Sequence, residues 1–121
     1  MPLTYVLVPG AGGDPFIWHR LVALLRDAGH EALTPELPVA DDRAGLEAYA
    51  DAIIVAAAGR ERIVIVAQSM GALAGPVAAE RLGAEQLVLV APMIPAPGET
   101  GGEWWTATGQ SSGSCTTCRS R

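Results

Sequence analysis

Residues 62–71 read Arg-Ile-Val-Ile-Val-Ala-Gln-Ser-Met-Gly, and this stretch decides the fold class. Its unbroken β-branched run predicts a strand over residues 62–67, of the kind found in parallel sheets that are covered on both faces. Residues 70–82, which follow directly, are rich in Ala and Gly and predict a helix. A buried strand that passes into a helix through a tight turn is typical of an α/β protein.

The same alternation of strand and helix extends in both directions from this stretch. Strands are predicted at 3–8, 32–37 and 87–90, and helices at 16–28 and 44–58. In the first helix we expect one shared apolar face, made of Ile17, Leu21, Leu24 and Leu25. The order β-α-β-α-β-α-β with short connections predicts a mostly parallel sheet with flanking helices and right-handed crossovers.

The turn after strand 62–67 contains Ser69, the first candidate for chemistry. Residues 67–71 fit the nucleophile-elbow pattern G-x-S-x-G, with Ala67 in place of the first glycine. Such a turn presents the serine hydroxyl above the sheet and directs the backbone N–H of Met70 towards an oxyanion. The alternative interpretation is that Ser69 only caps the N-terminus of the helix.

A second turn, residues 9–15 (Pro-Gly-Ala-Gly-Gly-Asp-Pro), follows the first strand. Acyl transfer needs a second backbone donor from such a glycine-rich loop, and the N–H of Ala11 is our candidate. The alternative is a dinucleotide-binding fingerprint, because Glu36 lies where a ribose-binding acid is expected. Pro15, however, stands where the G-x-G-x-x-G pattern requires glycine. No Gly-Lys-Ser or Gly-Lys-Thr follows the loop, which excludes a phosphate-binding P-loop.

Residues 3–105 resemble the N-terminal half of an α/β-hydrolase, of the esterase-like type that includes plant methylesterases and hydroxynitrile lyases. The matching segments are residues 5–13, 18–21 (Trp-His-Arg-Leu), 28–31 (Ala-Gly-His-Glu) and 67–71. Pro9 departs from the family, which usually has histidine there. The resemblance implies that Ser69 is the nucleophile and that the N–H groups of Ala11 and Met70 form the oxyanion hole. The candidate pocket-lining residues are Gly10, Gly12, His19 and Trp104, and His19 has an alternative as a half-exposed helix residue.

The resemblance also identifies what this chain lacks. In the family the triad order along the chain is Ser, then Asp or Glu, then His, whereas His19 and His30, the two histidines here, precede Ser69. The Asp/His half of the triad is absent from the chain as written, so we expect little activity from it.

The function that we infer is a serine hydrolase acting on small carboxylic esters. Two alternatives stay open, a non-catalytic small-molecule binding protein of the same fold and a dinucleotide-binding module. The substrate stays open too, as does the choice between hydrolase and lyase.

The character of the chain changes after Ala91. Residues 92–99 are rich in proline and predict a loop. The resemblance identifies residues 92–105 as the entry into a lid over the active site. Since the resemblance implies further strands, we expect the fold to be truncated after strand 87–90. We divide the chain into a partial hydrolase domain, residues 1–105, and a disordered tail, residues 106–121. Our hypothesis for the tail is a frameshift, which would make the Cys115–Cys118 pair accidental, and the alternative is a naturally short variant.

Composition excludes several functional classes. Of 121 residues, half are hydrophobic, and 8 basic against 13 acidic residues give a net charge of −5, which argues against a nucleic-acid partner. No apolar run is long enough to span a membrane and no signal pattern is present, so we expect a cytoplasmic protein. We expect a small ester as the binding partner, without a metal or an organic cofactor. Because strand 87–90 would form an uncharged apolar edge, we also expect self-association through it.

Overall fold

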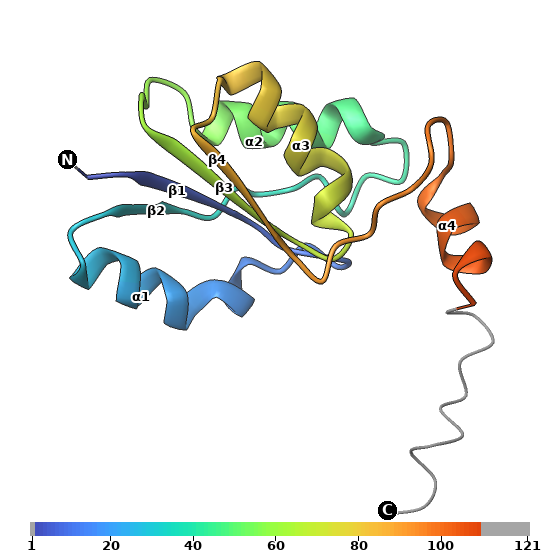
Figure 1. Ribbon diagram of the computed structural model, residues 1–121, viewed down its shortest axis with the longest axis horizontal. Coiled ribbons are helices and arrows are strands. Elements are labelled where there is room, and N and C mark those ends of the chain that lie inside the picture. Colours follow the sequence, from blue (N-terminus) through green and yellow to red (C-terminus); the bar gives the residue numbers. More distant parts are fainter. Residues whose placement is uncertain (1, 110–121) are drawn as a thin grey trace, which may run out of the picture.

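Four strands form one sheet in the spatial order β2-β1-β3-β4. The computed structural model describes residues 2–109. The strands are β1 (Thr4–Val8), β2 (Glu31–Leu33), β3 (Ile63–Gln68) and β4 (Gln86–Val90), and their three pairings are all parallel (Figure 1). The α/β class and the parallel sheet that the sequence predicts are confirmed.

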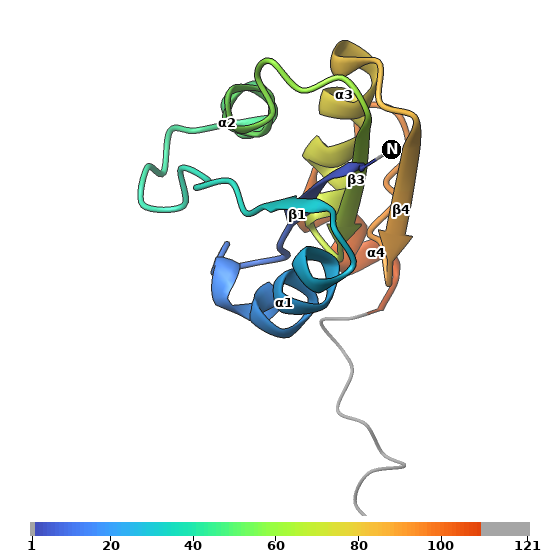
Figure 2. The same cartoon turned by 90° about the vertical axis from the view of Figure 1, so that its left-hand side faces the viewer.

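The helices lie in two layers, one on each face of the sheet (Figure 2). The 3-10 helix η1 (Pro15–Trp18) and α1 (His19–Asp27) lie on one face, whereas α2 (Leu46–Ala56) and α3 (Gly71–Leu82) lie on the other. Among residues 2–109, no helix is long and apolar enough to cross a membrane. The chain leaves β1 in one direction to form β2 and comes back past it to form β3. Open α/β sheets bind ligands at such a reversal, beyond the carboxyl ends of the strands.

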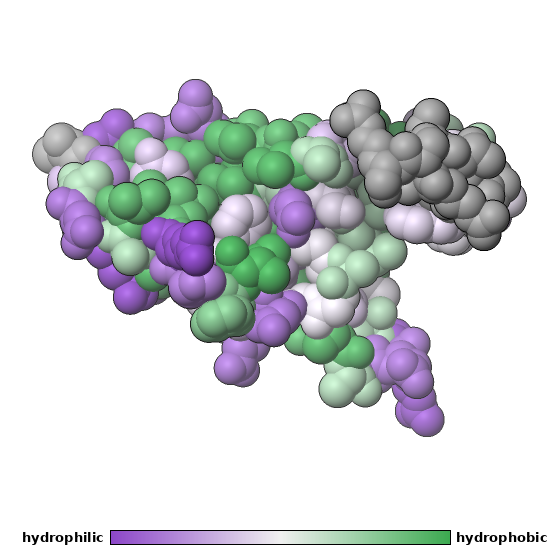
Figure 3. Space-filling view, turned by 90° about the horizontal axis from the view of Figure 1, so that it is seen from below, coloured by the Kyte–Doolittle hydropathy of each residue, from purple (hydrophilic) through white to green (hydrophobic). Residues whose placement is uncertain are grey.

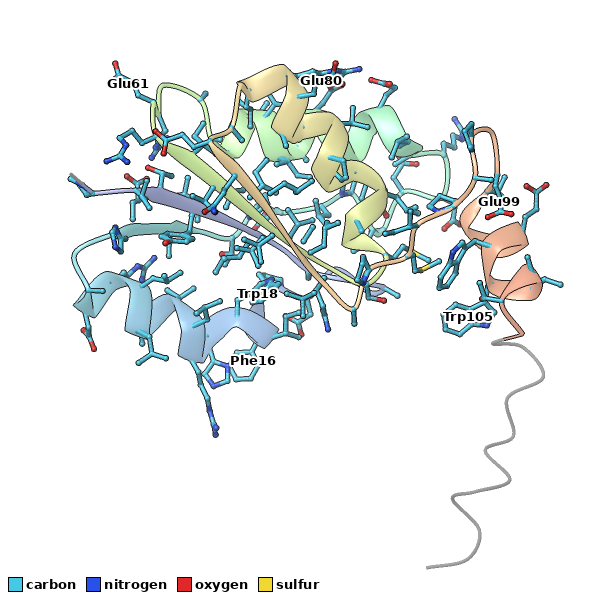
Figure 4. All side chains as sticks on the ribbon, in the orientation of Figure 1. Phe16, Trp18, Glu61, Glu80, Glu99 and Trp105 are labelled. Atoms are coloured by element: carbon cyan, nitrogen blue, oxygen red, sulfur yellow. The ribbon has the colours of Figure 1, made fainter. Side chains whose placement is uncertain are left out.

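The hydrophobic core lies on both sides of β3. Ile65 and Ala67 pack with residues of α2 and α3, while Val64 and Val66 pack with Trp18 and residues of α1. Figure 4 shows Trp18 between η1 and the sheet. Because neither face of β3 meets water, the strand carries apolar residues without alternation, as the sequence indicated.

One expectation about the first helix is wrong. Leu21 and Leu25 pack against the sheet as predicted, but Ile17 and Leu24 are 50% and 66% exposed. Ile17 belongs to η1, whose tighter turn gives its side chain a different direction. Leu24 lies about 100° around the helix axis from Leu25 and therefore leaves the contact with the sheet.

Two elements differ from their predicted extents. β2 ends at Leu33 rather than at residue 37, because Pro35 has no N–H to offer to a strand ladder. Helix α4 (Gly101–Ala107) forms across the end of the expected lid entry and the start of the expected tail, where we predicted no helix. A capping box between Thr100 and Glu103 begins it. The remainder of the predicted tail, residues 110–121 with both cysteines, lies outside the described residues.

Ion pairs on the surface join α2 to α3. Arg81 donates a hydrogen bond to Glu47 and lies 3.6 Å from Asp51. The hydrogen bond to Glu47 raises the pKa of the Arg81 guanidinium. Because these side chains are exposed to solvent, the pairs contribute little to stability.

Candidate active site

Ser69 lies in the two-residue turn between β3 and α3. Its φ angle is 51°, in the left-handed region that residues other than glycine rarely adopt. Strain of this kind is concentrated at functional sites, and the nucleophile elbow requires such a turn. The N-cap residue of α3 is Met70, without a capping side-chain hydrogen bond. The alternative of Ser69 as a simple helix cap is therefore wrong.

Three backbone hydrogen bonds hold Ser69 in this conformation. Its N–H donates to the carbonyl oxygen of Val90 at 2.9 Å, and its own carbonyl oxygen accepts from Ala72 at 3.1 Å and from Met93 at 3.0 Å. Ala91, between Val90 and Met93, also has a positive φ, of 45°. The strained turn is thus supported by the end of β4 and the segment that follows it, which are no part of the elbow motif.

Close packing explains the small residues around the elbow. A Cβ atom at Gly71 would lie 2.7 Å from the carbonyl oxygen of Pro9, and one at Gly75 would lie 2.8 Å from Cβ of Ala67. Neither distance is tolerable without movement of the chain. Ala67 therefore fits in place of the motif's first glycine because α3 presents glycine above it.

The two N–H groups that we expect to bind an oxyanion belong to residues beside Ser69. Met70 follows it directly, and a Cβ atom at Gly10, the neighbour of Ala11, would lie 3.1 Å from Cβ of Ser69. A hydrogen bond of 3.1 Å from the N–H of Gly13 to the carbonyl oxygen of Gly10 shapes the loop. Within residues 2–109, neither the Ala11 N–H nor the Met70 N–H donates a hydrogen bond. Both N–H groups are available to an acceptor on a ligand.

A cavity of about 840 Å³ opens beside the elbow. Its lining residues come from the glycine loop, the segment 37–49, the first turns of α3 and the segment 95–101. Gly10 and Gly12 are among them, together with Ala11 and Met70. Ser69 is not among them and adjoins the cavity through its neighbours Gly10 and Met70. The volume lies within the range of small-molecule sites.

Neither histidine lies beside the elbow. The ring of His19 stacks on Phe16 at a centroid distance of 4.2 Å, and its Nδ1 lies 2.7 Å from the Phe16 carbonyl oxygen, on an exposed turn. Nδ1 of His30 accepts a hydrogen bond of 2.9 Å from the N–H of Leu3, next to the amino end of β1. Within residues 2–109, no side chain hydrogen-bonds to Ser69, and no three ligand-type side chains cluster around a metal position.

Two segments of the cavity wall escaped the sequence analysis. Leu37 and Val39 come from the loop before α2, and Glu99 comes from the segment before α4. Trp104, which we expected in the lining, is half-buried in α4 and does not line the cavity, nor does His19. The one signal in the sequence was the proline-rich segment 92–99, which we had placed at the entry to a lid.

The glycine loop differs from a dinucleotide site. Oδ1 of Asp14 accepts a hydrogen bond of 2.9 Å from the N–H of Phe16, so a carboxylate occupies the helix start where a pyrophosphate would bind. Glu36 is exposed and lines a separate depression beside α2, not the cavity that Gly12 lines. Both observations disfavour the dinucleotide alternative.

Comparison with known sequences finds related proteins. A model described as the alpha/beta hydrolase family matches residues 5–115. The probable esterase PIR7A of rice (Oryza sativa subsp. indica) is 36% identical over 108 residues, a match that covers 78% of this chain and 41% of the relative. The rice esterase PIR7B (subsp. japonica) is 38% identical over 88 residues, covering 64% and 33%. The chain spans less than half the length of these relatives.

Solved structures share the fold. Polyneuridine aldehyde esterase superposes with a TM-score of 0.73 at 21% identity, covering 92% of this chain and 48% of the other. Tomato methylketone synthase I in complex with 2-tridecanone gives a TM-score of 0.71 at 23% identity, covering 91% and 47%. At this level of identity the likeness extends to the fold alone.

Proposed function

The chain belongs to the alpha/beta hydrolase family, and on that premise we propose that it represents a serine hydrolase acting on small carboxylic esters. The observation that carries the proposal is the strained Ser69, at φ 51° between a buried strand and a helix. The unpaired N–H groups of Ala11 and Met70 support it, because they are the donors that an oxyanion needs. Relatives named as esterases support the ester class.

In the proposed reaction, Oγ of Ser69 attacks the acyl carbon and the alcohol leaves with a proton. Water then attacks the acyl-serine, which releases the carboxylic acid and restores the hydroxyl. The N–H groups of Ala11 and Met70 donate to the carbonyl oxygen while it carries negative charge, a contribution of about 2.7–4 kcal/mol per donor. Because neither histidine contacts Ser69, the hydroxyl proton passes to solvent and the departing alkoxide takes a proton from solvent. We therefore expect slow turnover from this chain alone.

The test is covalent labelling combined with turnover. The full chain is treated with a fluorophosphonate and, separately, with p-nitrophenyl acetate, beside Ser69→Ala and Ser112→Ala. Ser69 is the sole serine in the first 110 residues, so its adduct falls on the tryptic peptide 63–81. We expect slow labelling and slow turnover that Ser69→Ala abolishes and Ser112→Ala leaves intact. Labelling that survives in Ser69→Ala would overturn the assignment.

Ligand binding without catalysis is the second candidate function. Two observations together favour it. A cavity opens beside the elbow, and neither His19 nor His30 lies near Ser69. Binding of an ester to the unaltered chain, with neither adduct nor turnover at Ser69, would favour this function over the hydrolase.

A further inference from the structure

The cavity beside the elbow has a strongly apolar wall. Leu37 and Val39 line it from the loop before α2, Leu46 and Tyr49 from α2 itself, and Leu73 and Pro76 from α3. Hydrocarbon is the chemistry that such a wall favours, because each methylene removed from water contributes about 0.8 kcal/mol. The glycine loop and Met70 lie in the same lining, so the polar end of a hydrocarbon chain bound here can reach the elbow.

Glu99 is the one charged residue among the described residues that line the cavity. The residue is half-buried, and its Oε1 accepts an exposed hydrogen bond of 3.3 Å from the N–H of Ala96, which also lines the cavity. The described lining residues include no arginine or lysine that could neutralise the negative charge of an anionic ligand. A negative group brought into this apolar space would lose hydration and meet a like charge.

We propose that this cavity binds the hydrocarbon chain of uncharged carbonyl compounds, such as medium-chain fatty acid esters, and that Glu99 discriminates against the corresponding carboxylates. The orientation of the ligand's carbonyl group rests on the proposed function, whereas the binding of its hydrocarbon chain does not. The site favours the ester over the acid that its hydrolysis releases, so the same charge selection promotes departure of the product.

Calorimetric titration of the full-length Ser69→Ala chain tests this selection without turnover. The probes are methyl octanoate and octanoate, which share the hydrocarbon chain and differ in charge. We expect methyl octanoate to bind at least tenfold more tightly than octanoate. Glu99→Gln should narrow that ratio by strengthening the binding of octanoate. Equal affinities in the Ser69→Ala chain, or tighter binding of octanoate, would overturn the proposal.

Glu61→Gln is the matched control for charge. Glu61 lies in the loop before β3, at the other end of the molecule from Glu99 (Figure 4), and its substitution changes the net charge equally. We expect it to leave the affinity ratio unchanged. A ratio that moves by the same factor in both variants would contradict a local effect of Glu99.

A second pair of variants tests the location. Ala44 lines the cavity, whereas Ala58 is exposed beyond the end of α2. Ala44→Trp should weaken methyl octanoate binding at least tenfold and Ala58→Trp should not, with thermal unfolding confirming that both variants fold. Unchanged binding in a folded Ala44→Trp chain would overturn the site. If the ester binds but the labelling experiment gives no adduct at Ser69, only the proposed hydrolase function is refuted. If Ser69 is labelled but the ester does not bind, only the proposed hydrocarbon site is refuted.

Discussion

Gly71 determines how closely α3 can approach the end of β1. A Cβ atom there would lie 2.7 Å from the carbonyl oxygen of Pro9 and 3.0 Å from that of Val8, both backbone atoms that cannot rotate away. We expect Gly71→Ala to lower the free energy of unfolding by about 1–3 kcal/mol, measured by urea denaturation. At Gly102 the nearest atom, Oγ1 of Thr100, lies 4.0 Å away, so Gly102→Ala should cost nothing. Equal losses in the two variants would refute the steric argument.

At the residue scale, the sequence predicted best the features that a short local motif determines. The motif at 67–71 indicated a strained Ser69 and close packing of small residues, and both are present, since the turn type alone requires them. The motif could not predict the hydrogen bond that Ser69 donates to Val90 or the one that it accepts from Met93, because both join it to a segment more than 20 residues away. The assignment of Ser69 as a nucleophile stays a prediction.

At the scale of elements, α4 is a short helix that begins at a capping box. It has seven residues, too few to be stable on propensity alone. Oγ1 of Thr100 accepts from the N–H of Glu103 at 3.1 Å, so Thr100→Ala should cost the helix about 1 kcal/mol. We expect about fivefold faster hydrogen exchange at the Trp104 N–H, which bonds to the Thr100 carbonyl oxygen at 2.9 Å. Thr106→Ala, which removes only a hydroxyl bond within the helix, should not accelerate this exchange.

The elements that the sequence located most accurately are those whose residue pattern is long and uninterrupted. β3 and α3 were placed to within about a residue or two, because an unbroken β-branched run marks a strand buried on both faces and a segment rich in Ala and Gly follows it directly. α4 was missed although Thr100 and Glu103 have capping-box spacing, since the surrounding Pro and Gly suggested a loop. The prolines of segment 92–99 were the one signal for the cavity wall, and its composition from 37–49 and 95–101 could not be predicted, because the wall exists only once distant segments pack together.

At the scale of the whole molecule, β4 leaves one side of the sheet open. It pairs with β3 alone among the described strands, and Val88, Leu89 and Val90 are 40%, 39% and 42% exposed. Val88 lies opposite Val66 in the sheet register and therefore on the α1 face, yet α1 packs beside β2, not β4. Figure 3, which views this face, shows hydrophobic residues gathered along the side of the molecule that carries β4. Such an edge is a template for pairing with another strand.

We expect a second copy of the chain to occupy this edge. β4 carries no charge, so two copies can pair around a two-fold axis without repulsion. Continued growth through the opposite edge is less favourable, because β2 has only three residues. Size-exclusion chromatography with light scattering should therefore give a concentration-dependent mass approaching twice the 12.5 kDa of the monomer.

Val88→Lys should prevent this pairing, because it places like charges on both edges at once. Val55, on α2, is 73% exposed, and Val55→Lys changes the net charge equally while leaving the edge intact. Since general repulsion between acidic chains would weaken in both variants, only a contact through β4 predicts a monomer for Val88→Lys and a dimer for Val55→Lys. A monomer of unaltered sequence at high concentration would show that the edge stays unpaired in spite of its exposure.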